Sequence, residues 1–227
     1  MISRTLDRLP DARTFLEVGC GQGAVAQRLA LRYEYVSYEP DAAAFAVASS
    51  RLAAVRRGRV INAPLPEVPD ASFDLVGAFE VLEHMEDDAA VLRAWIRWLK
   101  PGGSVILSVP AHQHRFGAWD RVVGHFRRYG RADLVRVLSG AGFEQVTVLA
   151  CGFPLGFVLE SARNLLAPRD SPATAEEQTA RSGRLLQPSA GVGWVTQLAT
   201  APFRWMQLPF VRSDLATAFV ACARRPA

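Results

Sequence analysis

A 20-residue stretch, residues 110–129, brings together side chains that could move a proton and side chains that could bind an anion. It contains three of the four histidines, four arginines and four aromatic residues. Histidine exchanges a proton near neutral pH more readily than other side chains, and the planar guanidinium of arginine suits a carboxylate or a phosphate. The stretch is therefore a candidate for acid–base chemistry on an acceptor that carries a negative group.

A second candidate site is the glycine-rich turn in residues 15–24, FLEVGCGQGA. A short apolar run ends there in an acid, glycine follows at every second position, and helical spacing resumes afterwards, which predicts a strand, a turn and a helix start. Glycine suits a backbone with φ > 0 or a close approach of a ligand, and the N–H groups of a helix start face that ligand. The turn predicts one of two ligands, a dinucleotide or S-adenosylmethionine.

The acid before the glycines helps to separate these two ligands. Gly19, Gly21 and Ala24 satisfy the loose Gly-x-Gly-x-x-Gly/Ala pattern, and Glu39 follows about 20 residues on, as a ribose-binding acid should. The carboxylate of Glu17 would repel a pyrophosphate, whereas a cationic sulfonium ligand with an ammonium group would gain from it. This favours S-adenosylmethionine.

Strands and helices alternate along most of the chain. Strands are predicted at residues 14–18, 34–39, 59–62, 73–79, 104–109, 143–151 and 214–224. Helices are predicted at residues 23–32, 41–55, 86–99 and 131–139. The alternation predicts an α/β fold with a Rossmann-like, seven-stranded sheet that is mostly parallel, has an antiparallel last strand and carries helices on both faces. The candidate residues lie just past strand ends, where such sheets bind ligands.

We expect a single domain over residues 1–227, with a cofactor-binding core at 14–151 and a helical insertion at 152–213, before the last strand. The insertion has an apolar helical part, a part rich in small residues and proline that we expect to be mobile, and an amphipathic part, at residues 152–167, 168–193 and 194–210. Its role stays open between a lid, a wall of the acceptor pocket and the contact of a homodimer.

Four spaced motifs then point to a family. They are EVGCGQG at 17–23, YEPD at 38–41, SFDLV at 72–76 with EVLEH at 80–84, and LKPGG at 99–103. Together they resemble the class I S-adenosylmethionine-dependent methyltransferases, of the group that acts on small molecules, over residues 14–151. The arrangement GHFRRY at 124–129 is similar to one in bacterial small-molecule methyltransferases.

The resemblance implies a role for each matching position. The methionine part of the cofactor would lie along the glycine turn, with Glu17 nearby, and Glu39 would accept from both ribose hydroxyls. Asn62 stands where the family usually has an aspartate that receives the adenine amino group. The full set of implied cofactor-binding residues is Glu17, Gly19, Cys20, Gly21, Gly23, Glu39, Pro40, Asn62, Ala63, Phe79 and Glu80.

Methyl transfer to oxygen needs an aligned acceptor and a group that takes its proton. His125 is the first candidate, followed by His112 and His84, and oxygen is the expected acceptor atom before nitrogen or carbon. Arg127, Arg128 and Tyr129 are candidates for binding an anionic group of the acceptor. The alternative is structural: His125 would hydrogen-bond backbone in a folded loop, and the arginines would tie that loop to the sheet. Asp74 and Glu83 are interpreted as structural.

Two other function classes stay open. An NAD(P)-dependent oxidoreductase would use the same turn, but the chain has no Tyr-x-x-x-Lys pair, since Lys100 is its only lysine. A catalytically silent subunit would keep the cofactor pocket without the chemistry.

No metal is expected, because Cys20, Cys151 and Cys222 form no Cys-x-x-Cys pair and the histidines of residues 110–129 match no ligand pattern. The net charge of +4 comes without a long basic run, so no nucleic-acid partner is expected. The sequence shows neither a basic-then-apolar leader nor an 18-residue apolar run. We therefore expect a cytoplasmic protein without stable membrane insertion.

Overall fold

A computed structural model of the chain describes residues 1–64, 68–166, 203 and 205–227. The strands are β1 (Thr14–Val18), β2 (Glu34–Tyr38), β3 (Arg59–Ile61), β4 (Phe73–Phe79), β5 (Leu99–Pro110), β6 (Glu144–Cys151) and β7 (Ala218–Arg224). The α-helices are α1 (Ile2–Leu6), α2 (Ala26–Ala30), α3 (Ala42–Val55), α4 (Asp88–Trp98), α5 (Ala118–Val123), α6 (Arg131–Gly140) and α7 (Leu155–Leu166). Single 3-10 turns are η1 (Leu82–His84), η2 (Gln113–Arg115) and η3 (Leu208–Phe210).

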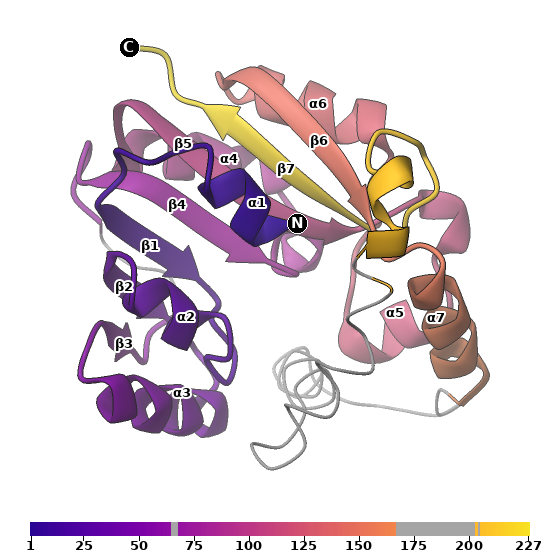
Figure 1. Ribbon diagram of the computed structural model, residues 1–227, viewed down its shortest axis with the longest axis horizontal. Helices are drawn as coiled ribbons and strands as arrows, with labels where there is room; N and C mark the ends of the chain where they lie inside the picture. Colours follow the sequence, from indigo (N-terminus) through magenta and orange to yellow (C-terminus); the bar gives the residue numbers. More distant parts are fainter. Residues whose placement is uncertain (65–67, 167–202, 204) are drawn as a thin grey trace.

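The strands form one seven-stranded sheet in the order β3-β2-β1-β4-β5-β7-β6 (Figure 1). The pairs among β1 to β5 are parallel, and β7 is antiparallel to both of its neighbours, β5 and β6. The register brings the last residues of β1 and β2, Val18 and Tyr38, side by side. The predicted sheet, with its antiparallel last strand, is confirmed.

Helices cover both faces of the sheet (Figure 1). One core contains Leu92 and Trp95 of α4 with Leu134 of α6, and the other contains Leu6 of α1 with Leu52 of α3. In α4 the apolar residues recur at helical spacing, so one stripe packs on the sheet while charged residues face solvent. Full burial of each such side chain contributes about 2 kcal/mol.

The largest differences from the sequence prediction lie at β5, α5 and β7. Strand β5 begins at Leu99, because the Lys100-Pro101-Gly102-Gly103 segment forms an irregular start of the strand instead of a separate turn. Gly102 has φ +74°, a conformation that glycine adopts easily. Helix α5 lies inside the stretch 110–129, where no helix is predicted, and β7 begins four residues later than expected, at Ala218.

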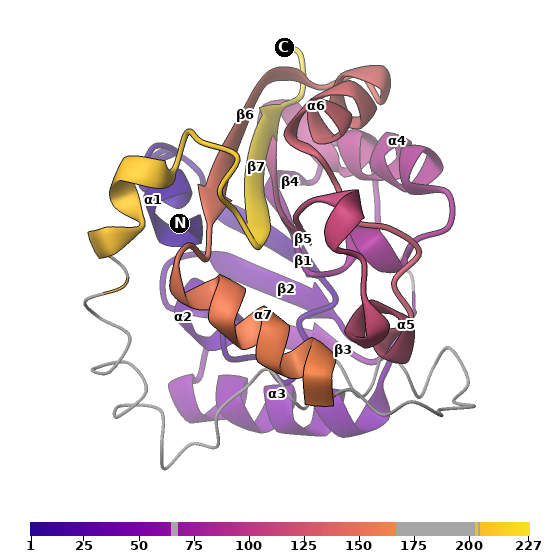
Figure 2. The ribbon, with the colours of Figure 1, turned by 90° about the vertical axis from the view of Figure 1, so that its right-hand side faces the viewer.

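Helices α5 and α7 lie together at the edge of the sheet where the parallel strands end (Figure 2). Helix α7 matches the predicted helix at 152–167. The segment 168–193 and most of 194–210, which carry the expectations of mobility and amphipathic helix, lie outside the described residues.

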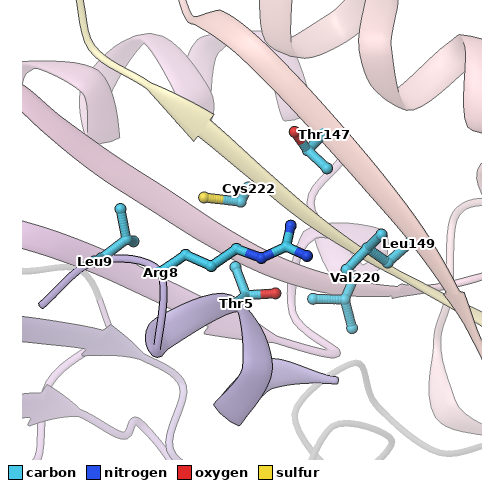
Figure 3. A pocket seen from close by; sticks show the side chains of 7 residues that line it. All are labelled: Thr5, Arg8, Leu9, Thr147, Leu149, Val220 and Cys222. Carbon is cyan, nitrogen blue, oxygen red and sulfur yellow. The ribbon is translucent and has the colours of Figure 1, made fainter.

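A small hollow lies between the N-terminal segment around α1 and the strands β6 and β7 (Figure 3). Thr5, Arg8 and Leu9 line it from the N-terminal segment, and Thr147, Leu149, Val220 and Cys222 line it from the sheet. None of the predicted cofactor or acceptor residues lines this hollow.

Candidate functional site

The glycine turn leaves the sheet directly after β1. Gly19, Gly21 and Gly23 have φ values of +69°, +54° and +78°, which disfavour other residues. A Cβ at Gly19 would lie 2.8 Å from a methyl carbon of Val81, and one at Gly23 would lie 2.9 Å from Cα of Ala48 in α3. The three glycines are thus required by backbone conformation, and two of them also by close packing.

Glu39 follows β2 and is held against this turn. Its Oε2 accepts a hydrogen bond from the Gly21 N–H at 2.7 Å, and its Oε1 accepts one from the Asp41 N–H at 3.0 Å. Burial raises the pKa of Glu39, although both N–H donors act in the opposite direction. Each carboxylate oxygen can accept more than one hydrogen bond, so both keep capacity for two adjacent hydroxyls.

Glu17 lies in the interior beneath the turn. The Tyr35 hydroxyl donates a 2.6 Å hydrogen bond to its Oε2. Burial, aided by the charge of Glu39, raises the pKa of Glu17 to about 8. Without a ligand the carboxyl is therefore mostly protonated at neutral pH. The negative charge that would repel a pyrophosphate is therefore mostly absent, so Glu17 separates a dinucleotide from S-adenosylmethionine less well than the sequence alone implies.

The residues that are predicted to lie near an adenine ring follow the ends of β2 and β3. The Asn62 side-chain N–H₂ donates to the carbonyls of Glu39 and Pro40, at 2.7 and 3.0 Å. Its Oδ1 is therefore the atom that can receive an amino group. The Ala63 N–H donates to the Ile61 carbonyl at 3.1 Å, so this donor, predicted to face the ring, already has a partner.

Glu80 lies at the end of β4, next to Phe79. It has φ +57°, which is unusual for a residue with a side chain. Its carboxyl accepts a hydrogen bond from the Ser108 hydroxyl at 2.8 Å, and its N–H donates to the Ser108 carbonyl at 2.9 Å. Burial raises the pKa of Glu80, against the opposing effects of Ser108 and of the nearby His125. Two hydrogen bonds to one serine hold the strained backbone in place.

Two of the three candidate histidines meet beyond β4. The rings of His84 and His125 stand edge to face with centroids 4.7 Å apart. Nε2 of His125 lies 3.8 Å from Oε1 of Glu83, and the Phe126 N–H donates to the Glu83 carbonyl at 2.8 Å. Burial, and then the neighbouring His125, lower the pKa of His84 to about 4. His84 is therefore neutral at physiological pH.

Glu83 is fully buried in this group. Across the part of the chain that the structure describes, neither of its carboxyl oxygens has a hydrogen-bond partner. Burial, and then the charge of Glu80, raise its pKa well above the ordinary value. Sequence reasoning interpreted Glu83 as structural; the signal that could have drawn attention to it is its position beside His84 directly after a buried strand.

Asp120 of α5 contacts the second ring nitrogen of His125, Nδ1. Oδ1 of Asp120 lies 2.8 Å from Nδ1 of His125, and the same carboxylate accepts from Nε and Nη2 of Arg128 at 2.8 and 2.7 Å. Burial alone would raise the pKa of Asp120, but the hydrogen bonds from His125 and Arg128 outweigh it and hold the pKa below the usual range. Asp120 is thus ionised and acts only as an acceptor.

The residues predicted to bind an anionic acceptor have partners within the protein. Arg128 is buried and also binds Glu160 of α7, to which Nε of Arg115 donates at 2.9 Å. Arg127 and the Tyr129 hydroxyl both contact Asp88, at 3.0 and 2.8 Å. This arrangement matches the alternative in which these side chains fix the loop.

His112 has a different set of partners from His84 and His125. Its Nε2 lies 2.6 Å from the Asp214 carbonyl oxygen, and its ring packs edge to face on Phe219, with centroids 5.3 Å apart. His112 therefore connects the loop after β5 to the segment that leads into β7.

Comparison with known proteins identifies the family. Residues 1–148 match a family described as "Methyltransferase domain". A probable S-adenosylmethionine-dependent methyltransferase of Mycolicibacterium smegmatis is 32% identical over 157 residues, which are 67% of this chain and 60% of that protein. A ubiquinone biosynthesis O-methyltransferase of Idiomarina loihiensis is 31% identical over 165 residues, 63% of this chain and 68% of that protein.

The chain belongs to the class I S-adenosylmethionine-dependent methyltransferases. Among solved structures, phosphoethanolamine N-methyltransferase 2 of Haemonchus contortus, in complex with S-adenosylmethionine, superposes with a TM-score of 0.63 at 18% identity. That superposition covers 99% of this chain and 52% of the other, and it shows the shared fold.

This methyltransferase chain spans about half to two thirds of the length of the curated relatives it matches. No helix in the described part of the methyltransferase is long and apolar enough to cross a membrane.

Proposed function

We propose that this methyltransferase methylates a hydroxyl oxygen of a small-molecule acceptor. When bound, S-adenosylmethionine supplies an electrophilic methyl group on a sulfonium sulfur. The printed name of the Idiomarina loihiensis relative, an O-methyltransferase, supports oxygen as the acceptor atom over nitrogen or carbon. The acceptor itself is defined only as a small molecule.

The residues around the glycine turn fit this cofactor. Gly19, Gly21 and Gly23 carry no side chain and have positive φ values, so the main chain of the turn would lie directly against a ligand. Glu39 holds both carboxylate oxygens at the end of β2, where they would accept from two ribose hydroxyls, and Oδ1 of Asn62 would accept from an adenine amino group.

The observation that carries the proposal is the contact between Asp120 and His125. Because ionised Asp120 can only accept, Nδ1 of His125 must carry the hydrogen, and the neutral ring then has its lone pair on Nε2. That nitrogen faces the group formed by Glu83 and His84, beside the end of β4. Nε2 would take the hydroxyl proton of the acceptor, and Asp120 would stabilise the imidazolium that forms.

The sequence-based expectation of an anionic acceptor is not part of the proposal. Arg128 is already neutralised by Asp120 and Glu160, and Arg127 by Asp88. The proposed acceptor is instead a neutral hydroxyl compound, such as a phenol, because the guanidinium groups of Arg127 and Arg128 already have carboxylate partners within the protein.

The test replaces His125 by alanine and measures release of S-adenosylhomocysteine, the demethylated cofactor, with a panel of phenolic and alcoholic acceptors. We expect kcat to fall about 10²- to 10⁴-fold, the usual contribution of a positioned base, while the affinity for S-adenosylhomocysteine stays within twofold. His114→Ala is the matched control, because His114 is exposed in the same loop. An unchanged kcat in His125→Ala would remove His125 as the proton acceptor. NADH binding without S-adenosylhomocysteine binding would favour the oxidoreductase alternative.

A further inference from the structure

We infer that Glu83, His84 and His125 form a binding site for a divalent first-row transition-metal cation. One carboxylate oxygen and two imidazole nitrogens, one from each residue, all lie within 4.8 Å of one another. The inference rests on the proposed function for one point only, that this group lies where the acceptor hydroxyl is activated.

The donor set has the chemistry of such a site. Imidazole and carboxylate together suit zinc, manganese and iron, whereas calcium and magnesium prefer oxygen ligands alone. Ligand atoms at about 2.1 Å from one ion lie roughly 3 to 4 Å apart. The three ligand atoms therefore need to approach one another by at most about 1 to 2 Å to bind one cation.

The unpartnered carboxyl of Glu83 is the second, independent observation. It is fully buried, and within the described residues neither oxygen accepts a hydrogen bond. An isolated carboxylate in such a place is strongly unfavourable, and a protonated carboxyl would still leave polar atoms unsatisfied. A bound cation would satisfy the carboxylate directly.

Both histidines are prepared as ligands. Asp120 fixes the ring of His125 through Nδ1, so the lone pair of Nε2 faces Glu83, an arrangement that commonly orients metal-binding histidines. The ring of His84 stands edge to face with that of His125, with centroids 4.7 Å apart, and contributes one nitrogen to the same group of ligand atoms.

Three protein ligands leave coordination positions open for an oxygen atom of the acceptor. Nε2 of His125 cannot bind the cation and take a proton at the same time. With the cation present, coordination itself would make the acceptor hydroxyl more acidic, and His125 would act as a ligand; in cation-free protein His125 would act as the base.

The test uses the full chain, freed of metal by dialysis against EDTA. Mn²⁺ binding is followed by electron paramagnetic resonance and Zn²⁺ binding by calorimetry, with and without S-adenosylhomocysteine. We expect one cation per chain, affinity reduced at least tenfold in Glu83→Gln and in His84→Ala, and unchanged affinity in His114→Ala. Thermal melting provides a second readout, because the cation should raise the Tm of the wild type and leave that of folded Glu83→Gln unchanged.

Absence of stoichiometric binding, or equal affinity in the wild type, Glu83→Gln and His84→Ala, would overturn the inference. Such a result would leave the proposed function intact, because methyl transfer with His125 as the base needs no cation. Failure of S-adenosylhomocysteine to bind would instead remove the proposed function, while cation binding by the three side chains would still stand.

Discussion

Nδ1 of His125 lies 2.8 Å from Oδ1 of Asp120, and this contact sets the orientation of the histidine from within its own loop. The same carboxylate binds Arg128, which in turn binds Glu160 on α7. One buried chain of hydrogen bonds and ion pairs therefore links the candidate base, the loop after β5 and the helix that follows β6.

Asp120→Asn tests whether this carboxylate acts on His125. The amide keeps the shape but loses the charge that would stabilise an imidazolium, so we expect kcat to fall about 10- to 100-fold, as for partners that orient functional histidines. Steady-state kinetics should show this loss in kcat with little change in the KM for S-adenosylmethionine.

Glu160→Gln is the control for Asp120→Asn, because it perturbs the same Arg128 without contacting His125. We expect its kcat to stay within about threefold of the wild type, since losing one buried partner mainly lowers stability. An equal loss of kcat in both variants would mean that Asp120 acts through the fold and not through His125.

The raised pKa of buried Glu17 predicts that the free energy of unfolding falls as pH rises. The unfolded chain ionises Glu17 near its ordinary pKa of 4.5, whereas the folded chain keeps the proton until about pH 8. Between these values the folded state binds more protons, so its free energy of unfolding should fall with a slope approaching about 1.4 kcal/mol per pH unit.

Glu17→Gln should remove this contribution, so the variant should gain stability relative to the wild type between pH 5 and 8. Urea unfolding at pH 5, 6.5 and 8 measures the difference. Glu34→Gln, an exposed glutamate on β2, should follow the wild-type pH dependence. Parallel curves for Glu17→Gln and the wild type would contradict the raised pKa.

Asp74 predicts the opposite pH dependence. Its carboxylate accepts from the N–H groups of Arg13 and Thr14 and from Lys100, each at 2.9 Å. Although burial acts to raise the pKa of Asp74, these donors outweigh it and lower the pKa below its usual range. The stabilisation is therefore present above about pH 4 and is lost as pH falls below it.

Asp74→Asn should lower the free energy of unfolding by about 2 kcal/mol at pH 7, the scale of lost hydrogen bonds to a charged group, without changing affinity for S-adenosylhomocysteine. Asp70→Asn is the matched control, because the Asp70–Arg97 pair is exposed and should contribute under about 1 kcal/mol. Equal effects of the two substitutions, measured by urea unfolding, would contradict the structural role of Asp74.

Much of the sheet can be predicted from the sequence, because buried parallel strands read as short apolar runs. Phe73–Phe79 matches its predicted strand at both ends, and Thr14–Val18 also matches. Helix α5 is only six residues long and lies among polar and aromatic residues, so it has no periodic signal. The sequence does not predict the start of β5 at Leu99, because the proline and glycines that follow it are more typical of a turn.

Some parts of the candidate site can also be predicted from the sequence, and others cannot. Glu39 and the glycines follow strand ends, so topology alone predicts that they meet, and the structure joins Gly21 to Glu39. The pairing of Arg128 with Glu160 joins residues 32 positions apart through an insertion whose position no local pattern specifies. Sequence reasoning therefore assigned Arg128 to the acceptor, although its guanidinium binds carboxylates of the protein itself.

Binding of S-adenosylhomocysteine to the wild type and to Glu39→Ala, measured by calorimetry, tests the cofactor site most directly. We expect 1:1 binding with a Kd in the micromolar range, about tenfold or more weaker in Glu39→Ala because two charge-assisted hydrogen bonds are lost. Glu34→Ala, at the exposed start of the same strand, should bind like the wild type. Equal affinity in folded Glu39→Ala, or no binding by the wild type, would contradict a cofactor site between the glycine turn and Glu39.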